Sequence, residues 1–320
     1  MKRVAVLRGG PSEQYETSME TGNVVLNALK QRDYTCKDIV VTKKGEWLDG
    51  GFVKSPGDAL KAVDTVFVAL HGQYGEDGKV QKILENEEIP FTGSRALPSA
   101  IAFNKDLTKR IIKSHGVKTP QYRLVKRGEE DSIENEIPSI LAELGSELFI
   151  KPVAGGSSIG ASYVRNDEIL FNSLKELLQQ YKQVMVEEFI RGREATVGVV
   201  SNFRNEDLYI LPAVEIVPPK SDVFYSNENK QNALSDQICP GRFSYHEKAR
   251  LAEISETVHK AIGCRHYSRS DFIIRNGEVY FLEINTLPAF TDNSNFPKAS
   301  RAIGLDFPDL IQHLVENAHF

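Results

Sequence analysis

The opening part of the chain alternates between short apolar runs and a helical pattern, and this alternation constrains the fold most strongly. Residues 3–7, "RVAVL", and 64–70, "DTVFVAL", are mainly apolar runs typical of buried strands. Between them, residues 17–31 carry apolar side chains at helical spacing. Strand, helix and strand in this order predict an α/β fold with a doubly wound parallel sheet. A helix over about 77–85 and a short strand in 89–93 continue the pattern.

Two further units follow this sheet. A helix over 104–117 that stops at Gly116, a strand near 121–125, a helix opened by Pro138 and a strand over 147–153 predict a small second domain.

The rest of the chain is richer in strands. Long strands over 194–203 and 207–217 and a helix over 246–262 predict a large antiparallel sheet in a third domain. The long polar segment 218–245 is expected to be a functional lid, with a floppy insertion as the alternative. The expected domains are residues 1–103, 104–188 and 189–320.

The composition of the chain indicates which partners it can bind and in which cellular compartment it works. The 320 residues carry a net charge of -5, which argues against a nucleic-acid partner because such proteins usually present a basic face. Since no apolar stretch approaches the ~20 residues of a membrane span, we expect no membrane partner. Three widely separated cysteines suit a reducing compartment, so we expect a cytoplasmic protein.

Two loops of the first domain are expected to flank one crevice. Gly9-Gly10 ends the first strand, and His71 ends the strand over 64–70. In doubly wound sheets, ligands bind beyond the carboxyl ends of the strands. Glycines at such a turn often bind phosphate, so the first loop is a candidate nucleotide site. A structural role for His71 is the alternative.

A second glycine-rich loop lies in the second domain, in "FIKPVAGGSSIGAS", residues 149–162. Lys151 ends a strand, and Gly155, Gly156, Ser157 and Ser158 follow it. Glycines let backbone N–H groups approach phosphate oxygens, and serines add donors. The segment lacks the closing Gly-Lys-Ser/Thr of a Walker A loop. It predicts a phosphate site, with a flexible turn as the alternative.

The third domain ends in a predicted hairpin, "RSDFIIRNGEVYFLEINTLP", residues 269–288. Arg269 and Asp271 share one face of the first strand, and Glu283 and Asn285 share one face of the second. Such oxygen ligands suit Mg²⁺ held together with substrate phosphates. Ordinary surface polar residues are the alternative, but carboxylates in an apolar strand are costly to bury without a partner.

The metal hypothesis depends on the register of this hairpin. A two-residue turn at Asn276-Gly277 places Asp271 opposite Leu282, which puts Asp271 and Glu283 on opposite faces. A three-residue loop shifts the register by one and brings them to one face. We therefore expect the longer loop, and a two-residue turn without a bulge would contradict the shared site.

In this order, eight segments resemble the D-alanine–D-alanine ligase family of the ATP-grasp superfamily. They are "GGPSEQYETSMETG", "HGQYGEDG", "NKDLTK", "KPVAGGSSIGAS", "EEFIRGRE", "DQICP", "RSDF" and "EINTLP". The resemblance covers essentially the whole chain. It implies a three-domain ATP-grasp architecture and an ADP-forming ligase that joins two D-alanines through an acyl phosphate for peptidoglycan precursors. It also suggests a homodimer.

The resemblance implies an ATP site between the second and third domains. Lys105 and Lys151 match the lysines that bind the nucleotide phosphates. Glu187 and Glu194 match the glutamates that contact adenine and ribose. Without the resemblance, these two residues would be interpreted as solvent-exposed surface charges. The other expected ATP contacts are Ser158, Glu188, Ile190 and Lys230, of which Lys230 matches the lysine that closes the lid.

The resemblance also implies the catalytic and substrate groups. Two Mg²⁺ ions, with Mn²⁺ able to substitute, are expected on Asp271, Glu283 and Asn285. Arg269 matches the arginine over the developing oxyanion, and Ser294 matches a serine that holds the second substrate's carboxylate. The expected catalytic residues are Arg269, Ser157, Gln14 and Lys230, and the other expected substrate contacts are His71, Gln231, Ala289 and Asn295.

Four positions depart from the family pattern. Gln14 stands where the family places a glutamate that binds the first substrate's ammonium, and Gln231 stands where it places an aromatic residue. Ala289 replaces a usual glycine, and Asn295 replaces a usual aliphatic residue. These departures leave open a related ligase with a different first substrate. A catalytically weak nucleotide-binding paralogue is a further alternative.

Overall fold

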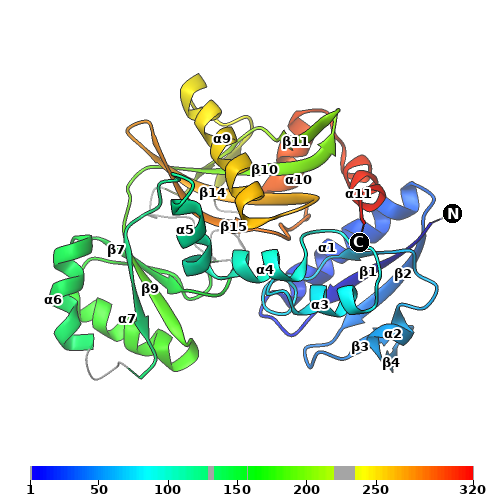
Figure 1. Cartoon of the computed structure of the whole chain (residues 1–320), viewed down its shortest axis with the longest axis horizontal. Coiled ribbons are helices and arrows are strands. Elements are labelled where there is room, and N and C mark those ends of the chain that lie inside the picture. Colours follow the sequence, from blue (N-terminus) through cyan, green and yellow to red (C-terminus); the bar gives the residue numbers. More distant parts are fainter. Residues whose placement is uncertain (1, 129–132, 157, 220–234, 320) are drawn as a thin grey trace.

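The computed structural model describes residues 2–128, 133–156, 158–219 and 235–319, which form three sheets with helices packed around them (Figure 1). In the first sheet, β1 (Arg3–Gly9) lies between β2 (Thr35–Val41) and β5 (Thr65–Val68) and pairs with both in parallel. The predicted parallel α/β core is therefore confirmed. The short strand expected in 89–93 is reduced to a single parallel bridge between Val66 and Phe91.

The edge of this sheet is antiparallel, which the sequence pattern did not predict. β3 (Trp47–Asp49) pairs with β2, and β4 (Phe52–Lys54) pairs with β3, so the sheet is mixed. The reason is the length of the connections. A parallel crossover needs a dozen or more residues, whereas only residues 42–46 separate β2 from β3.

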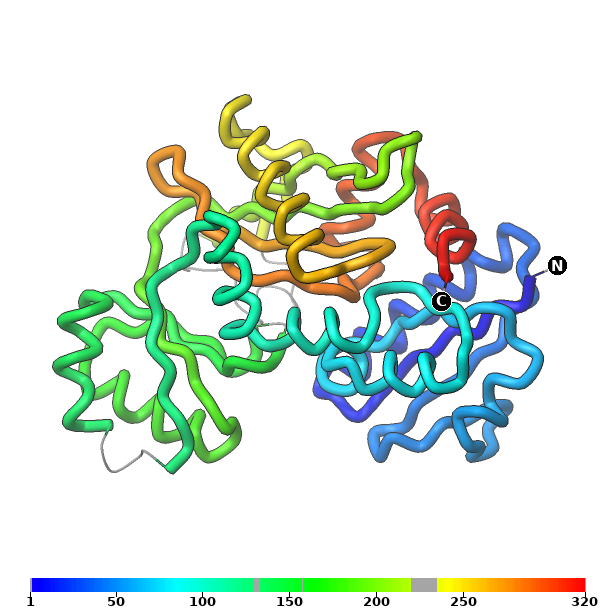
Figure 2. Tube along the Cα trace, viewed as in Figure 1, coloured from blue at the N-terminus to red at the C-terminus, as the bar shows by residue number. Residues whose placement is uncertain are grey.

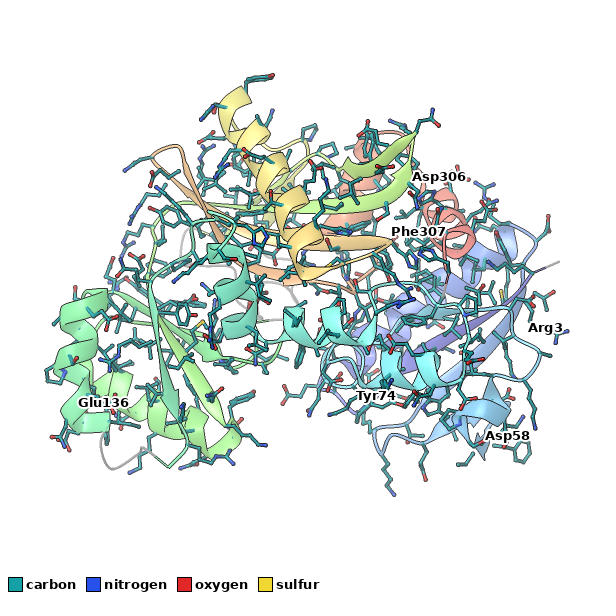
Figure 3. All side chains as sticks on the ribbon, in the orientation of Figure 1. Arg3, Asp58, Tyr74, Glu136, Asp306 and Phe307 are labelled. Carbon is teal, nitrogen blue, oxygen red and sulfur yellow. The ribbon has the colours of Figure 1, made fainter. Side chains whose placement is uncertain are left out.

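The helices of the first unit come from both ends of the chain. Three of them, α1 (Tyr15–Gln31), α2 (Pro56–Ala59) and α3 (Lys79–Asn86), belong to the N-terminal part. The fourth, α11 (Phe307–Glu316), is the last helix and packs against α1 and β5. Asp306 caps the start of α11 (Figure 3). The two ends of the chain lie near each other (Figure 2), and Lys2 Nζ donates to the Val315 carbonyl at 2.9 Å.

The second sheet is antiparallel, with strand order β6-β9-β7-β8. Helices α6 and α7 pack against it, and their apolar faces close a separate hydrophobic core that contains Ile140, Ile150 and Leu174. The elements of this unit are β6 (Tyr122–Lys126), α6 (Ile133–Leu144), β7 (Leu148–Pro152), β8 (Ser162–Val164), α7 (Asp167–Gln180) and β9 (Gln183–Glu188).

The third sheet has six strands in the order β13-β12-β10-β14-β15, with β11 paired to β10. Its strands are β10 (Arg193–Phe203), β11 (Glu206–Ile210), β12 (Val214–Val217), β13 (Asp236–Ile238), β14 (Tyr267–Arg275) and β15 (Glu278–Asn285). The predicted large antiparallel sheet is confirmed. The single strand expected over 207–217 is divided around Pro212, because proline has no N–H to donate to a ladder.

Helices that belong to different parts of the chain cover this third sheet. The long helix α9 (Tyr245–Ile262) packs on β10, β14 and β15, and α4 (Ala96–Phe103) and α5 (Lys105–Lys113) pack beside it (Figure 1). The remaining helix, α10 (Asn295–Ala302), packs against β10. Consequently α5, which leads into the second unit, is held against the third sheet.

The limits of two helices differ from the expected ones. Pro138 lies inside α6 and does not open it, so that expectation is wrong; the Pro138 position lacks the N–H that would otherwise bond back one turn to Glu134. The expected helix over 104–117 ends at Lys113, and Gly116 follows in a left-handed conformation with φ 73°. The three domain boundaries stay a prediction.

In the described part of the chain, every helix is too short or too polar to cross a bilayer.

The N-terminus of α9 has a complete capping box. Glu247 N–H donates to Ser244 Oγ at 3.3 Å, and Ser244 N–H donates to Glu247 Oε2 at 2.8 Å. We expect Ser244→Ala to lower the free energy of unfolding by about 1 kcal/mol, because it leaves a helix N–H without its partner. Urea unfolding followed by circular dichroism measures the change.

The matched control is Thr257→Ala in the same helix. The Thr257 hydroxyl donates to the Glu253 carbonyl, which is already engaged in the helix, so its loss is expected to leave stability unchanged or slightly raised. Equal destabilisation by the two substitutions would contradict a specific role for the cap.

Candidate functional site

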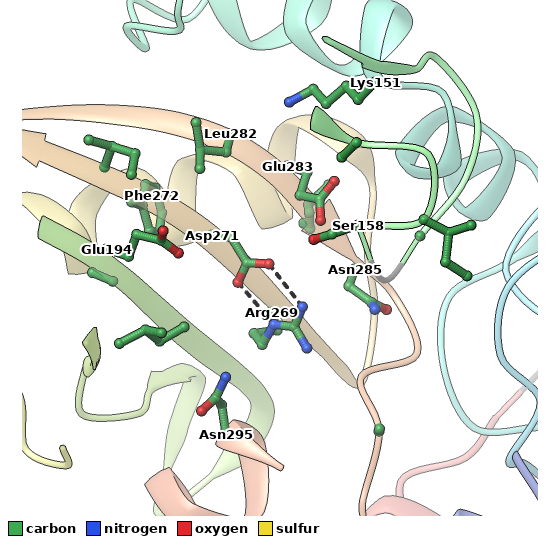
Figure 4. A pocket seen from close by; sticks show the side chains of 18 of the residues that line it. Lys151, Ser158, Glu194, Arg269, Asp271, Phe272, Leu282, Glu283, Asn285 and Asn295 are labelled. Atoms are coloured by element: carbon green, nitrogen blue, oxygen red, sulfur yellow. Dashed lines mark hydrogen bonds and ion pairs between the residues drawn. The ribbon is translucent and has the colours of Figure 1, made fainter. Parts of the chain in front are cut away.

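A cavity of about 900 Å³ lies where the three units meet. Its walls come from the opening loop of the first unit, the glycine-rich loop and β9 of the second, and β10, β14, β15 and the start of α10 of the third (Figure 4). The described site residues that line it are Gln14, His71, Lys105, Lys151, Ser158, Glu187, Glu188, Ile190, Glu194, Arg269, Asp271, Glu283, Asn285, Ala289, Ser294 and Asn295. Ser157, Lys230 and Gln231 lie outside the described residues.

The β14–β15 hairpin brings its polar residues to one face by a route that differs from the predicted one. Arg275 pairs with Glu278, so the turn contains only Asn276 and Gly277, both with positive φ. The expected three-residue loop is therefore wrong. The Asn-Gly pair adopts the tight turn because both residues tolerate left-handed conformations.

A β-bulge next to the site restores the register. Phe272 pairs with Phe281, whereas the preceding residue, Asp271, pairs with Glu283, so Leu282 is the extra residue on β15. In a ladder without the bulge, Leu282 would lie opposite Asp271, and Glu283 would point to the other face. Figure 4 shows that Asp271, Glu283 and Asn285 project into the same space. The predicted shared face is confirmed, and the bulge is its cause.

The Arg269 side chain is held rigidly by its neighbour on β14. Its Nε and Nη2 donate to the two carboxylate oxygens of Asp271 at 3.0 and 2.9 Å. Thr196 on β10 donates a further hydrogen bond to Asp271 at 2.5 Å. Burial by itself would lower the pKa of Arg269, but the charge of Asp271 outweighs it and raises that pKa. The guanidinium is therefore a permanent positive charge facing the cavity.

Lys105 connects the glycine-rich loop to the hairpin. It is the first residue of α5, and its Nζ donates to the Gly155 carbonyl at 2.6 Å. The same atom lies 3.4 Å from Glu283 Oε2. Because α5 packs on the third sheet, this lysine is positioned where the second and third units approach each other.

The oxygen set on the hairpin fits a hard cation that is completed by a ligand. Within the described residues, no group of three or more His, Cys, Asp or Glu side chains could hold a metal ion by itself. Two carboxylates and one amide remain, from Asp271, Glu283 and Asn285. This is the partial set that Mg²⁺ uses when substrate phosphates supply further ligands.

Glu187 is buried between two lysines at the wall of the cavity. Its Oε2 lies 2.7 Å from Lys151 Nζ, and its Oε1 lies 2.5 Å from Lys109 Nζ. Burial alone would raise the pKa of Glu187, but the two cations outweigh it and the pKa falls. The neighbouring Glu188 is engaged differently, because its carboxylate accepts from the Gln121 backbone N–H at 2.9 Å.

The sequence reasoning missed Lys109 and Thr196. Lys109 follows Lys105 by one helical turn, so its spacing on an amphipathic helix was the available signal. Thr196 gave no signal, because its contact with Asp271 depends on the pairing of β10 with β14.

The opening loop and His71 flank one crevice, as predicted. The His71 Nδ1 lies 3.1 Å from the Leu287 carbonyl, which can only accept, so Nδ1 carries the proton. Its Nε2 lies 2.9 Å from the Thr21 hydroxyl. His71 thereby ties the first unit to the loop that follows β15. The Gly9 turn must be glycine, because a Cβ there would lie 2.3 Å from the Val41 carbonyl oxygen.

Gln14 lies where two glycine loops meet. A Cβ added to Gly72 would lie 2.9 Å from Gln14 Nε2, and one added to Gly156 would lie 3.2 Å from it. Glu13 and Glu16 line the same cavity. The opening loop thus lies next to the glycine-rich loop of the second unit.

The start of α10 forms the opposite end of the cavity. Ser294 is the N-cap residue, and its hydroxyl lies 2.8 Å from Thr291 Oγ1. The Asn295 Oδ1 atom is buried and has no hydrogen-bond partner among the residues that the structure describes. Helix N-termini present unpaired N–H groups and favour anions, so a carboxylate fits at this end.

Known proteins resemble the whole chain. A family model described as "D-ala D-ala ligase C-terminus" matches residues 111–316, and one described as "D-ala D-ala ligase N-terminus" matches residues 50–94. A D-alanine–D-alanine ligase from Pelotomaculum thermopropionicum is 39% identical over 99% of this chain and 96% of its own. One from Desulforudis audaxviator is 37% identical over 99% of both chains.

Solved structures agree with this likeness. The D-alanine–D-alanine ligase of Coxiella burnetii has a TM-score of 0.82 at 27% identity and covers 99% of this chain and 95% of its own. The VanG D-Ala:D-Ser ligase of Enterococcus faecalis has a TM-score of 0.82 at 29% identity and covers 98% of both. The Bacillus anthracis D-alanine–D-alanine ligase complexed with ATP has a TM-score of 0.80 at 28% identity and covers 99% and 97%.

The pairing of Asp271 with Glu283 beside the bulge can be tested directly. We expect deletion of Leu282 to keep Mn²⁺-dependent binding of ATP, because Glu283 then pairs with Asp271 in a regular ladder and both side chains still share one face. The matched control, Leu282→Ala, keeps the extra residue and is expected to bind within about threefold of the parent, a change of less than ~1 kcal/mol. Titration calorimetry with and without Mn²⁺ measures both. Loss of metal-dependent binding in the deletion variant, with binding kept in Leu282→Ala, would contradict this pairing.

Proposed function

The chain belongs to the D-alanine–D-alanine ligase family, and from this premise we propose how the residues of its cleft divide the work. The protein is an ATP-dependent, ADP-forming ligase of the ATP-grasp fold that joins two D-alanines for peptidoglycan precursor synthesis. The observation that carries the site assignment is the convergence of Lys105, Lys151 and Arg269 with the carboxylates of Asp271 and Glu283 around one cavity.

The reaction has two steps. A carboxylate is a poor electrophile, so an oxygen of the first D-alanine's carboxylate takes the γ-phosphoryl group of ATP, and ADP leaves. The amine of the second D-alanine then attacks the acyl phosphate carbon, loses a proton, and displaces phosphate as the amide bond forms. Both steps develop negative charge that fixed cations can stabilise.

We assign the phosphates of ATP to the space between Lys105, Lys151 and the loop that carries Ser157 and Ser158. Glu187 and Glu194 would contact adenine and ribose, with Glu188 and Ile190 beside them; all four line the cavity. Lys230 would close over the phosphates. Its neighbour Gln231 would contact the first substrate.

Asp271, Glu283 and Asn285 would hold two Mg²⁺ ions, for which Mn²⁺ would substitute. The ions would neutralise charge on the transferred phosphoryl group. The side chains of the three proposed ligands project into the same space, which supports this assignment (Figure 4).

Arg269 would stabilise the oxyanion of the tetrahedral intermediate. Its pairing with Asp271 uses two of the five guanidinium N–H donors and fixes the plane of the group. A donor fixed in advance needs no reorganisation when the charge develops, which is the main source of such stabilisation.

The two amino-acid substrates would lie at opposite sides of Arg269. We place the first beside Gln14, His71 and Ser157, and the second at the start of α10, with its carboxylate on Ser294 and with Ala289 and Asn295 nearby. The start of α10 lines the cavity, and the positive end of a helix favours a carboxylate there, which supports this placement.

A different first substrate is not favoured. Relatives that share 39% and 37% identity over nearly the full chain carry the D-alanine–D-alanine ligase name. A catalytically weak paralogue is not favoured either, because it would have little use for Arg269 together with Asp271, Glu283 and Asn285.

We further propose a cytoplasmic homodimer with the domain division 1–103, 104–188 and 189–320. Family membership and the three free cysteines support these assignments. Sedimentation of the purified protein tests the dimer, and limited proteolysis at the proposed boundaries tests the division.

The activity itself is tested by ADP release with Mg²⁺ and a panel of amino and hydroxy acids. Turnover that requires only D-alanine as the acid is expected. Turnover with other acids but not with D-alanine would contradict the proposed substrate, and ATP binding without turnover across the panel would contradict a ligase.

The neutral Gln14 gives a sharper prediction. A carboxylate would add a charge-assisted bond to an ammonium worth ~1.5–3 kcal/mol, or roughly ten- to hundredfold in affinity. We expect Gln14→Glu combined with Gln231→Tyr to lower the Michaelis constant for the first D-alanine by this factor. Steady-state kinetics with D-alanine as the varied substrate measure it.

The control for this prediction is Gln31→Glu, which adds the same charge at the far end of α1 and away from the cavity. It is expected to leave the Michaelis constant unchanged. An unchanged constant in the Gln14→Glu, Gln231→Tyr variant would show that these two positions do not set the first-substrate affinity.

A further inference from the structure

Lys109 is a charged side chain buried behind the cavity rather than in it. Its side chain is 0% exposed, and it is absent from the cavity wall, although the partner of its ion pair, Glu187, is part of that wall. Lys109 comes from the middle of α5 and lies between the buried residues Thr108 and Ile112 of the same helix face. Nothing in the proposed reaction uses it directly.

The second lysine on Glu187 lies on the other side of the carboxylate. Lys151 comes from β7, lines the cavity, and keeps 9% of its side chain exposed. One carboxylate therefore lies between an inner lysine that no ligand can reach and an outer lysine that borders the cavity. Figure 4 shows the outer lysine, Lys151, at the edge of the pocket that the hairpin carboxylates also line.

The proposed function requires Lys151 to bind a phosphate of ATP, whereas Lys109 has no ligand to bind. If Lys151 binds a phosphate of ATP, its Nζ, now 2.7 Å from Glu187 Oε2, shares its charge with that phosphate and neutralises Glu187 less. Glu187 must at the same time remain ionised to accept strongly from the adenine amino group, because a charge-assisted bond is about twice as strong as a neutral one. A buried carboxylate without a counter-charge would instead take up a proton.

We propose that Lys109 is the resident counter-ion of Glu187, a positioning residue that keeps this carboxylate charged and in place while Lys151 binds the nucleotide phosphates. The proposal rests on the proposed function, because it deepens the roles given there to Glu187 and Lys151. It adds a determinant of adenine recognition that does not touch the nucleotide.

The surroundings of Lys109 explain why it cannot leave. Its Nζ lies 5.5 Å from the centre of the Tyr122 ring, and Tyr122 pairs directly with Glu187 across β6 and β9. The Tyr122 hydroxyl in turn donates to Asp106 on α5 at 2.8 Å. Burial lowers the pKa of Lys109 to about 8, which still leaves it mostly charged at neutral pH. Helix, ring and carboxylate thus hold the ammonium on the inner side of Glu187.

The test compares ATP with purine riboside triphosphate, an analogue that lacks the adenine amino group. In the full-length ligase, we expect Lys109→Met to reduce the preference for ATP over the analogue, in kcat/KM, by about tenfold, or ~1.4 kcal/mol. The Michaelis constant for D-alanine is expected to stay within about twofold. A merely structural defect would weaken both nucleotides by the same factor and would overturn the proposal.

The matched control is Lys113→Met, one turn further along α5. Lys113 is exposed, and its Nζ lies 4.9 Å from the centre of the same Tyr122 ring. The Lys113→Met substitution removes the same charge from the same helix and leaves the ion pair of Glu187 intact. Its preference for ATP over the analogue is expected to equal that of the parent, and a loss as large as that of Lys109→Met would overturn the proposal.

A double variant keeps the test informative if Lys109→Met folds poorly. Removing both members of a buried pair is often close to neutral for stability, whereas removing one leaves an uncompensated charge. We therefore expect Lys109→Met in the Glu187→Gln background to fold and to change the nucleotide preference no further than Glu187→Gln alone. An additional loss of preference in that background would overturn the proposal.

The same assay separates this inference from the proposed function. Failure of the parent protein to release ADP with D-alanine would contradict the function. Normal turnover by the parent, together with equal nucleotide preference in Lys109→Met and Lys113→Met, would contradict only the inference.

Discussion

A charged group that is taken out of water needs a counter-charge, and this requirement organises the whole cleft. Asp271 lies between Arg269 and Thr196, and Glu187 lies between Lys109 and Lys151. Each arrangement holds a reactive or binding group in one orientation before any ligand arrives. The protein therefore presents fixed charges to ATP, as a site that stabilises transferred phosphoryl groups requires.

The helix α5 links these arrangements across the units of the protein. Lys105 at its start reaches the glycine-rich loop and lies near Glu283, while Lys109 one turn later reaches Glu187 on β9. Because α5 also packs on α9 and β15, the lysines keep their positions relative to the hairpin. One short helix thus coordinates the groups that we assign to the phosphates with those that we assign to adenine.

The sequence was sufficient to predict which types of residue line the site. The hairpin shows what the sequence could not predict. The residues that alternate along β14 were predicted correctly, because side-chain direction in a strand follows from spacing alone. The turn at Asn276-Gly277 was assigned the wrong length, since the shared face required a register shift and a longer loop was one way to obtain it. The chain obtains the shift from Leu282 instead.

Other differences have the same origin. The antiparallel edge of the first sheet and the ion pair of Lys109 depend on where distant segments meet, as does the packing of α11 on α1. Single-sequence patterns report periodicity and local turn chemistry, and they carry no direct information on which elements become neighbours.

By itself, the sequence determined the parallel core around β1, the large antiparallel sheet, the glycine-rich loop and the oxygen-bearing side chains of the hairpin, because each depends on local spacing. It also determined that Gln14 is neutral. Only the tertiary structure decided that Asp271 and Glu283 share a face, that His71 bonds to the Leu287 carbonyl, and that Lys109 lies behind Glu187. The reason is physical: bulges, buried ion pairs and contacts between units are set by packing in three dimensions, where residues far apart in the chain compete for the same partners.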